Sequence, residues 1–230
     1  KGVNEWRGGN GPQSIETAKA NHPLNRAFLL AGKQAGYDYT EDQNGKKHEG
    51  FHVAQSFTRN GKRCSAARAY LYPALKRPNL KVETNCMVNQ VQFDGRRAVK
   101  VVAEQRGNRV IFEANREIIL CGGAINSPQL LMLSGVGQPN HLKEHGITNI
   151  ADVPAVGKNL ENHVIAAVTY GSPAGVSLAE KLNGWRKYQV GLQWLLFKNG
   201  IGASTMCETG SFFKSSDSVG YADIQHEFYA

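Results

Sequence analysis

Residues 121–137 read CGGAINSPQLLMLSGVG, and this stretch decides how the chain is expected to fold. It begins at the last residue of the run EIILC (residues 117–121), which predicts a buried strand. Ser127 is the expected N-cap and Pro128 the first helical residue, because serine caps helices and proline fits their first turn. The two glycines between strand and helix predict a sharp turn with no Cβ atoms.

Gly122 and Gly123 matter for binding as well as for shape. The start of a helix offers unpaired N–H groups and the positive end of a dipole, which favour phosphate. From these residues alone, two interpretations stay open: a nucleotide-binding turn, or a tightly packed corner where glycine only permits closeness. Ser134 and Gly135 are expected to end the helix. Three of its leucines are expected to face the sheet: Leu130, Leu131 and Leu133.

The composition indicates a folded globular chain. It has 230 residues, 41% of them hydrophobic, and no apolar run of the length that a transmembrane helix needs. The formal net charge is +8, but lysines and arginines are scattered, which favours a solvated surface over nucleic-acid binding. The four cysteines form no C-x-x-C pair, so we expect free thiols in a reducing compartment and no zinc site.

The rest of the chain predicts an α+β fold. Ser65 is the expected cap of a short helix, and a β-meander is expected over residues 80–123. After residue 150 the pattern predicts a crossover and then a second group of strands and a helix. The expected elements are a helix at 23–36, a strand at 51–57, a helix at 66–75, a strand at 164–171, a helix with two glycine interruptions at 177–199, and strands at 208–215 and 221–230.

The stretch GAINSPQLLMLSGVG resembles the second signature of the glucose-methanol-choline oxidoreductase family, G-[AST]-x-x-[ST]-P-x-L-L-x-x-S-G-[IV]-G, and fills every fixed position. The segments RNGKRCSAARAYLYPALKRPNL, HLKEHGI, DVPAVGKNLENH and YADIQHEFYA also resemble family segments, so the likeness covers almost the whole chain. It is closest to the bacterial choline and alcohol dehydrogenases. The resemblance implies FAD as cofactor and oxidation of a small-molecule alcohol, such as choline or another primary alcohol, by hydride transfer to flavin.

The resemblance also implies the domains. They are a linker at 1–15, a partial FAD-binding domain of α/β type with its meander at 16–158, and part of an antiparallel-sheet substrate-binding domain at 159–230. The family's G-x-G-x-x-G motif and catalytic histidine have no counterpart in this sequence. We therefore expect a middle segment that associates with preceding and following segments and is inactive alone. The electron acceptor stays open.

Six residues are expected by resemblance to bind the cofactor. Met87 and Val88 match a strand whose backbone contacts the adenine, which requires an exposed peptide edge such as a strand at a sheet margin offers. The other four form the glycine turn against the flavin nucleotide: Cys121, Gly122, Gly123 and Ala124.

Glu208 is the candidate substrate contact. It matches an acidic position that choline-oxidising relatives place near the substrate, where a carboxylate attracts a trimethylammonium group. A purely structural role for Glu208 stays open. Arg63 either faces the cofactor or hydrogen-bonds loop carbonyls.

The histidines are given structural roles. His163 is expected to form hydrogen bonds at the crossover, and His226 to share a strand face with its i±2 neighbours. His141 and His145 have helical metal-ligand spacing but no third ligand nearby, so a helix surface is expected. Two other functions stay open: an FAD-containing lyase of the same fold and a non-enzymatic basic binding domain. The expected location is the cytoplasm, with peripheral membrane association as an alternative.

Overall fold

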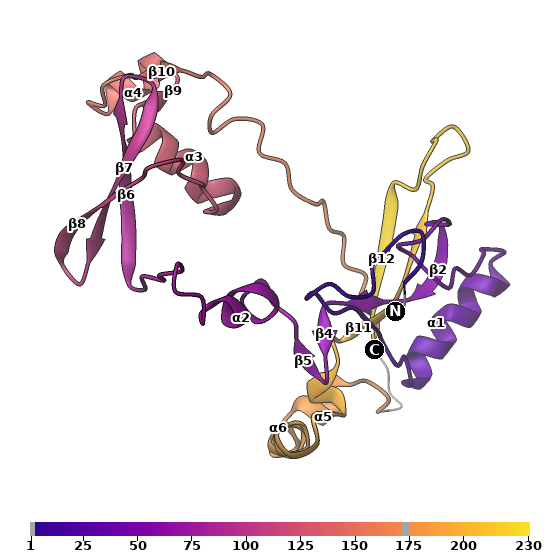
Figure 1. Cartoon of the computed structure of the whole chain (residues 1–230). Helices are drawn as coiled ribbons and strands as arrows, with labels where there is room; N and C mark the ends of the chain where they lie inside the picture. Colours follow the sequence, from indigo (N-terminus) through magenta and orange to yellow (C-terminus); the bar gives the residue numbers. More distant parts are fainter. Residues whose placement is uncertain (1–2, 172–174) are drawn as a thin grey trace. The chain divides into compact units, whose positions relative to one another are not determined.

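The computed structural model describes residues 3–171 and 175–230 and divides the chain into two compact units (Figure 1). Unit 1 consists of Lys1–Leu80 and Thr169–Ala230, and unit 2 of Lys81–Val168. Helices and antiparallel sheets occur in both, so the chain is α+β as expected. The boundary expected at residue 158 separates a cofactor-binding from a substrate-binding domain. The two compact units do not test it, so it remains a prediction.

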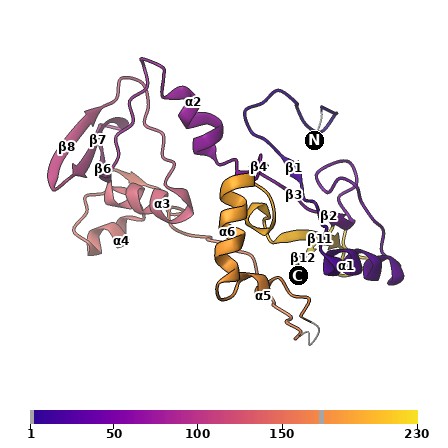
Figure 2. The ribbon, with the colours of Figure 1, turned by 90° about the horizontal axis from the view of Figure 1, so that it is seen from below.

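Unit 1 is built on a three-stranded antiparallel sheet with the order β12-β11-β2. The central strand β11 (Cys207–Phe213) pairs with β2 (Gly50–Val53) on one side and β12 (Ile224–Tyr229) on the other. Helix α1 (Pro23–Gln34) contacts all three strands, and Figure 2 shows it lying beside the sheet. Strands from two distant parts of the sequence therefore form one sheet, and α1 contacts strands from both parts.

Helix α1 forms where the sequence predicts it. Its N-cap is His22, whose Nδ1 accepts a hydrogen bond from the Leu24 amide at 3.3 Å, and Pro23 begins the helix. The apolar face packs through Phe28, whose ring lies 4.9 Å from Phe51 and stacks on Phe228 at 4.6 Å between centroids. These aromatic contacts join the helix to both edge strands of the sheet.

Shorter elements surround this sheet. The helix expected after Ser65 is present as a π-helical turn (Ala67–Leu71) followed by α2 (Tyr72–Ala74). Of the two glycines expected to interrupt the later helix, Gly184 (φ +59°) separates two helices and Gly191 lies inside the second one. The remaining elements of unit 1 are β1 (Glu16–Thr17), β3 (Gln55–Ser56), β4 (Thr58–Arg59), β5 (Lys62–Arg63), α5 (Ala179–Leu182), α6 (Arg186–Phe197) and a 3₁₀ helix (Ile201–Ala203).

Unit 2 contains the expected meander. Strands β6, β7 and β8 form an antiparallel sheet in sequence order, joined by tight turns. Helix α3 packs on β6, one of the two edge strands, and the buried apolar residues include Val91, Val102 and Leu142. The elements of unit 2 are β6 (Cys86–Asp94), β7 (Arg97–Gln105), β8 (Asn108–Glu113), α3 (Gly123–Leu133), β9 (Val136–Gly137), α4 (Pro139–Glu144) and β10 (Ala151–Asp152).

Two expected strands are absent. Residues 117–121 are not a buried strand, and Ile119 is 72% exposed. Residues 164–171 are likewise extended but unpaired, with Val164 fully exposed. An apolar run becomes a strand only when a neighbouring strand accepts its hydrogen bonds, and no described residue pairs with either segment. Both predictions were therefore wrong for this chain.

The start of α3 also differs from the prediction. The helix begins at Gly123 with Gly122 as N-cap, so Ser127 and Pro128 lie inside it. The left-handed backbone of Gly123 (φ +79°) turns the chain into the helix one turn earlier, and Pro128 removes one internal hydrogen bond. Leu133 is exposed rather than packed on the sheet. The predicted end of the helix at Ser134 is confirmed.

Within the described residues, no helix combines the length and the apolar character needed to cross a bilayer.

Candidate functional site

The glycine corner, defined here as residues 121–124, lies at the N-terminus of α3 in unit 2. Gly123 has φ +79°, a conformation that favours glycine, and no heavy atom lies within 4 Å of the position that a Cβ would occupy there. At Gly122 the nearest atoms to such a Cβ belong to Asn126 and Ser127, at 3.1–3.3 Å. The space over Gly123 is therefore open, as a site for a closely approaching ligand requires.

Met87 and Val88 lie on β6, whose one strand partner among residues 3–171 and 175–230 is β7. The outer edge of this strand leaves main-chain groups without a sheet partner in the described residues, and the Met87 side chain is 69% exposed. The strand is at the sheet margin, as the adenine contact would require.

Ser134 joins β6 to α3. Its hydroxyl accepts a hydrogen bond from the Val91 amide at 2.8 Å and donates one to the Leu130 carbonyl at 2.6 Å. Ser134 is 2% exposed, so both bonds are shielded from water. The sequence marked Ser134 only as a helix stop, and the contact between strand and helix appears only in three dimensions.

These features are compatible with FAD. Cys121, Gly122, Gly123 and Ala124 are all exposed, and the first turn of α3 presents free N–H groups beside the open space at Gly123. The positive φ of Gly123 accounts for the use of glycine there, since an added Cβ would meet no neighbouring heavy atom. The assignment of individual cofactor contacts remains a proposal.

Glu208 lies in unit 1, on β11. Its carboxylate accepts hydrogen bonds from Asn25 Nδ2 at 3.2 Å and from Ser204 Oγ at 2.9 Å. The side chain is half-buried, and none of the ion pairs among the described residues involves it. Glu208 thus keeps an unneutralised negative charge that can attract a cation. No pattern in the sequence pointed to Asn25 or Ser204 as its partners.

The neighbouring Cys207 is a poor nucleophile. Burial, together with the charge of Glu227, raises the pKa of the Cys207 thiol to about 11. The four cysteines are free, as expected.

The histidines for which structural roles are expected lie on a strand, on a helix and in an extended segment, and the side chains of both His226 and His163 are exposed. His226 faces α1, contacts Phe213 at 4.8 Å between ring centroids, and lies 3.1 Å from the Ser211 hydroxyl. His141 and His145 stack edge to face at 4.8 Å on the surface of α4. In the described part of the chain, no three histidine, cysteine or acidic side chains gather in a possible metal site. His163 is exposed in the extended segment after β10.

The sequence did not single out His52. It is 4% exposed on β2, and burial lowers the pKa of its imidazole. Arg63 and Ser65 lie near the β4–β5 hairpin. The Arg63 side chain is exposed, and Ser65 Oγ accepts from the Arg68 amide at 3.4 Å, a long capping bond.

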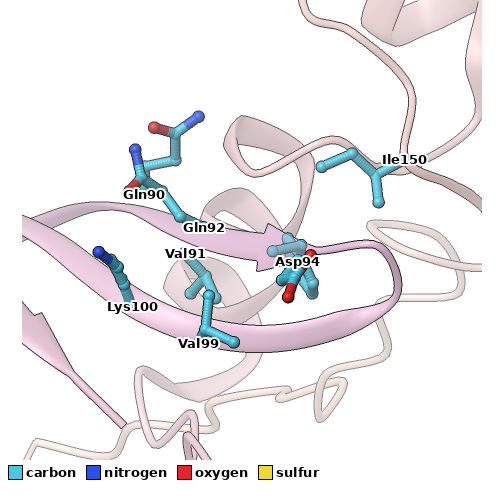
Figure 3. Close-up of a pocket in the computed structure, with 8 residues that line it drawn as sticks. Gln90, Val91, Gln92, Asp94, Val99, Lys100 and Ile150 are labelled. Atoms are coloured by element: carbon cyan, nitrogen blue, oxygen red, sulfur yellow. The ribbon is translucent and has the colours of Figure 1, made fainter.

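An open hollow lies beside the β6–β7 hairpin (Figure 3). Gln90, Val91 and Asp94 line it from β6, Lys100 from β7, and Ile150 from the loop before β10. It includes none of the glycine-corner residues, and its side chains do not form a recognisable catalytic set.

Solved structures place the fold among oxidoreductases. The chain resembles the crystal structure of formate oxidase with a TM-score of 0.77 and 25% identity, covering 89% of this chain and 36% of that one. It also resembles pyridoxine 4-oxidase from Mesorbium loti, with a TM-score of 0.61 and 33% identity over 64% of this chain and 29% of that one.

The curated relatives narrow this class. The chain is 44% identical over 227 residues to the oxygen-dependent choline dehydrogenase of Brucella ovis, covering 99% of this chain and 41% of the relative. It is 45% identical to the mitochondrial choline dehydrogenase of Mus musculus, covering 99% and 38%. The profile of the GMC oxidoreductase family matches residues 10–165. The chain belongs to the GMC oxidoreductase family, for which the comparisons indicate FAD as cofactor, and it spans about two fifths of these relatives' length.

Proposed function

We propose that this chain forms part of an FAD-dependent enzyme that oxidises an alcohol CH–OH group. The observation that carries the proposal is the open glycine corner. Its left-handed Gly123 leaves free space at the start of α3, in a chain whose family signature covers that same turn. FAD supplies the hydride acceptor when it is bound. The chain contributes the backbone of residues 121–124 and the edge of β6 at Met87 and Val88 as the cofactor-holding surface.

The proposed substrate is choline or another primary alcohol, with Glu208 as its contact. Two hydrogen-bond donors hold the Glu208 carboxylate, and no described cation neutralises it. A trimethylammonium group has no N–H to donate and is held chiefly by charge attraction, which a fixed carboxylate provides. The printed names of the 44–45% identical relatives, which are choline dehydrogenases, support the same choice.

The cofactor part is tested by thiol protection. Cys121 is exposed in the glycine corner, so bound FAD should slow its alkylation in the complete protein, and GTP at equal concentration should not. Unchanged labelling of Cys121 with FAD bound would place the cofactor elsewhere.

The reaction is tested with the flavin itself. Anaerobic addition of choline or another primary alcohol to the flavin-loaded protein should bleach the flavin absorbance. Persistence of the colour with every alcohol, accompanied by cleavage of a substrate bond, would support a lyase instead.

We further propose that the 230 residues need the rest of the protein. Large apolar side chains are exposed on either side of the glycine corner, at Ile119 and Ile125, and on α6, among them Leu196 and Phe197. Such surfaces are normally covered by other protein. The isolated chain should show no alcohol oxidation, and turnover by the purified chain with FAD would contradict this. The proposed location is cytoplasmic, and sedimentation of the complete protein with washed membranes would replace it by a peripheral membrane location.

A further inference from the structure

Glu208 occupies an irregular position in its strand. The pairing of β11 with β12 runs from Cys207 opposite Tyr229 to Thr209 opposite Phe228, so Glu208 is the extra residue of a β-bulge. A bulge turns the side chain of its extra residue out of the regular alternation. Met206, just before the strand, has φ +69°, so the chain enters the strand through a left-handed turn. The backbone therefore sets the direction of the Glu208 side chain before any side-chain contact is made.

Each carboxylate oxygen of Glu208 is then held by a different element. Asn25 of α1 donates from Nδ2 to Oε2 at 3.2 Å, across 183 positions of sequence. Ser204, just after the 3₁₀ helix, donates from Oγ to Oε1 at 2.9 Å. Two donors that come from opposite parts of the sequence fix both the position and the rotation of the carboxylate.

The two donors are themselves oriented. Asn25 Oδ1 accepts a hydrogen bond from Thr209 Oγ1 at 3.2 Å, which leaves the Nδ2 side of the amide directed at Glu208. Ser204 Oγ accepts from the Met206 amide at 3.0 Å, so its own hydrogen is left for the carboxylate. Each hydrogen bond therefore donates toward the carboxylate: Thr209 donates to Asn25, and Asn25 donates to Glu208.

Asn25 is an unusual choice for its place. It is 1% exposed on the sheet-facing side of α1, where an apolar side chain would ordinarily pack, and Thr209 is 0% exposed. Burying an amide costs free energy unless its groups are hydrogen-bonded, and here Thr209 and Glu208 satisfy one group each. The hydrogen bond to Glu208 accounts for a polar residue at this buried position.

We infer that Asn25 and Ser204 are positioning residues that aim the Glu208 carboxylate at the cationic group of the substrate. This inference rests on the proposed function of Glu208. Because the carboxylate is already fixed, the substrate does not have to order it on binding, and the advantage applies only to a charged substrate. A role confined to folding would affect charged and neutral substrates alike.

The test compares two substrates in the flavin-loaded complete protein. One is choline, and the other is its neutral isostere, in which a tert-butyl group replaces the trimethylammonium group. The variants Asn25→Leu and Ser204→Ala should each raise KM for choline about 3- to 10-fold, the loss expected for one hydrogen bond. The KM for the isostere and kcat for both substrates should stay within about twofold of the parent values.

Two further variants act as controls. Ser211→Ala removes a hydroxyl on the same strand, at 0% exposure, that bonds His226 and not Glu208, so it should leave the ratio of the two KM values unchanged. Ser204→Thr keeps a hydroxyl and should restore the preference for choline that Ser204→Ala loses. Ser204 is half-buried, so its variants test the inference even when Asn25→Leu folds poorly.

The variant Glu208→Gln distinguishes the positioning role of Asn25 and Ser204 from the proposed contact between Glu208 and the substrate. If this variant abolishes the preference for choline while Asn25→Leu and Ser204→Ala keep it, the positioning role is wrong and the proposed function stands. If Glu208→Gln leaves the preference unchanged, Glu208 does not contact the charged group and both inferences fall. Equal increases of KM for both substrates in the Asn25 and Ser204 variants would also overturn the positioning role.

Discussion

Replacing Gly32 with alanine tests how closely α1 packs on the sheet of unit 1. A Cβ at this position would lie 2.5–2.6 Å from three ring atoms of Phe51, against 3.4–4 Å for ordinary contact. The ring must therefore move by about 1 Å, in an interior that is already close-packed. It is restrained by Phe28 at 4.9 Å and Tyr37 at 5.7 Å between centroids. Overpacking of this kind costs about 1–3 kcal/mol.

Alanine also favours helix over glycine by about 0.8–1.0 kcal/mol, which offsets part of that cost. Gly191→Ala is the matched control, because Gly191 lies inside α6 and an added methyl group would meet no heavy atom within 4 Å. This variant therefore gains the higher helix propensity of alanine without any overpacking. The difference in free energy of unfolding between the two variants should therefore be about 1–3 kcal/mol, with Gly32→Ala the less stable. Urea unfolding of the complete protein, followed by far-ultraviolet circular dichroism, measures it. Equal shifts for the two variants would refute the packing argument.

Three other perturbations have defined outcomes. Ser134→Ala leaves a buried β6 amide without its acceptor, so urea unfolding should show a loss of about 1–3 kcal/mol; no loss would mean that another group replaces the hydroxyl. The hydrogen bond from Arg7 lowers the pKa of Asp42 below its unfolded value of about 3.9. The stability that this pair adds is present above pH ~4 and lost as pH falls through the folded-state pKa, so Asp42→Asn should flatten the acid limb of stability against pH; an unchanged limb would contradict this. With its raised pKa, Cys207 should react with iodoacetamide far more slowly than exposed Cys121 in the flavin-free protein, as peptide mass spectrometry would show; equal rates would be inconsistent with burial of Cys207.

Local elements followed the sequence where short-range chemistry determines them. The proline at position 23 and the apolar spacing behind it give α1, and the tight turns between residues 94 and 108 give the β6–β7–β8 meander. The end of α3 at Ser134 followed from Ser-Gly at its close. Each depends on contacts within about a dozen residues, which the sequence displays directly.

The predictions failed where a partner had to be supplied from elsewhere. Residues 117–121 have the composition of a buried strand, but composition cannot provide the neighbouring strand that would accept its hydrogen bonds. The start of α3 was misplaced because Ser127 and Pro128 are a strong local signal, while the left-handed turn at Gly123 began the helix earlier.

By itself, the sequence determined the family and the kind of cofactor, because the signature at residues 123–137 is contiguous and the glycines that it needs are adjacent in the chain. It also singled out Glu208. Only the tertiary structure decided what holds that carboxylate. Asn25 and Ser204 reach it from a helix and a turn 179 positions apart, which the pairing of β11 and β2 beneath α1 brings together. Such a contact is set by the sheet pairing, and no local pattern in the sequence records it.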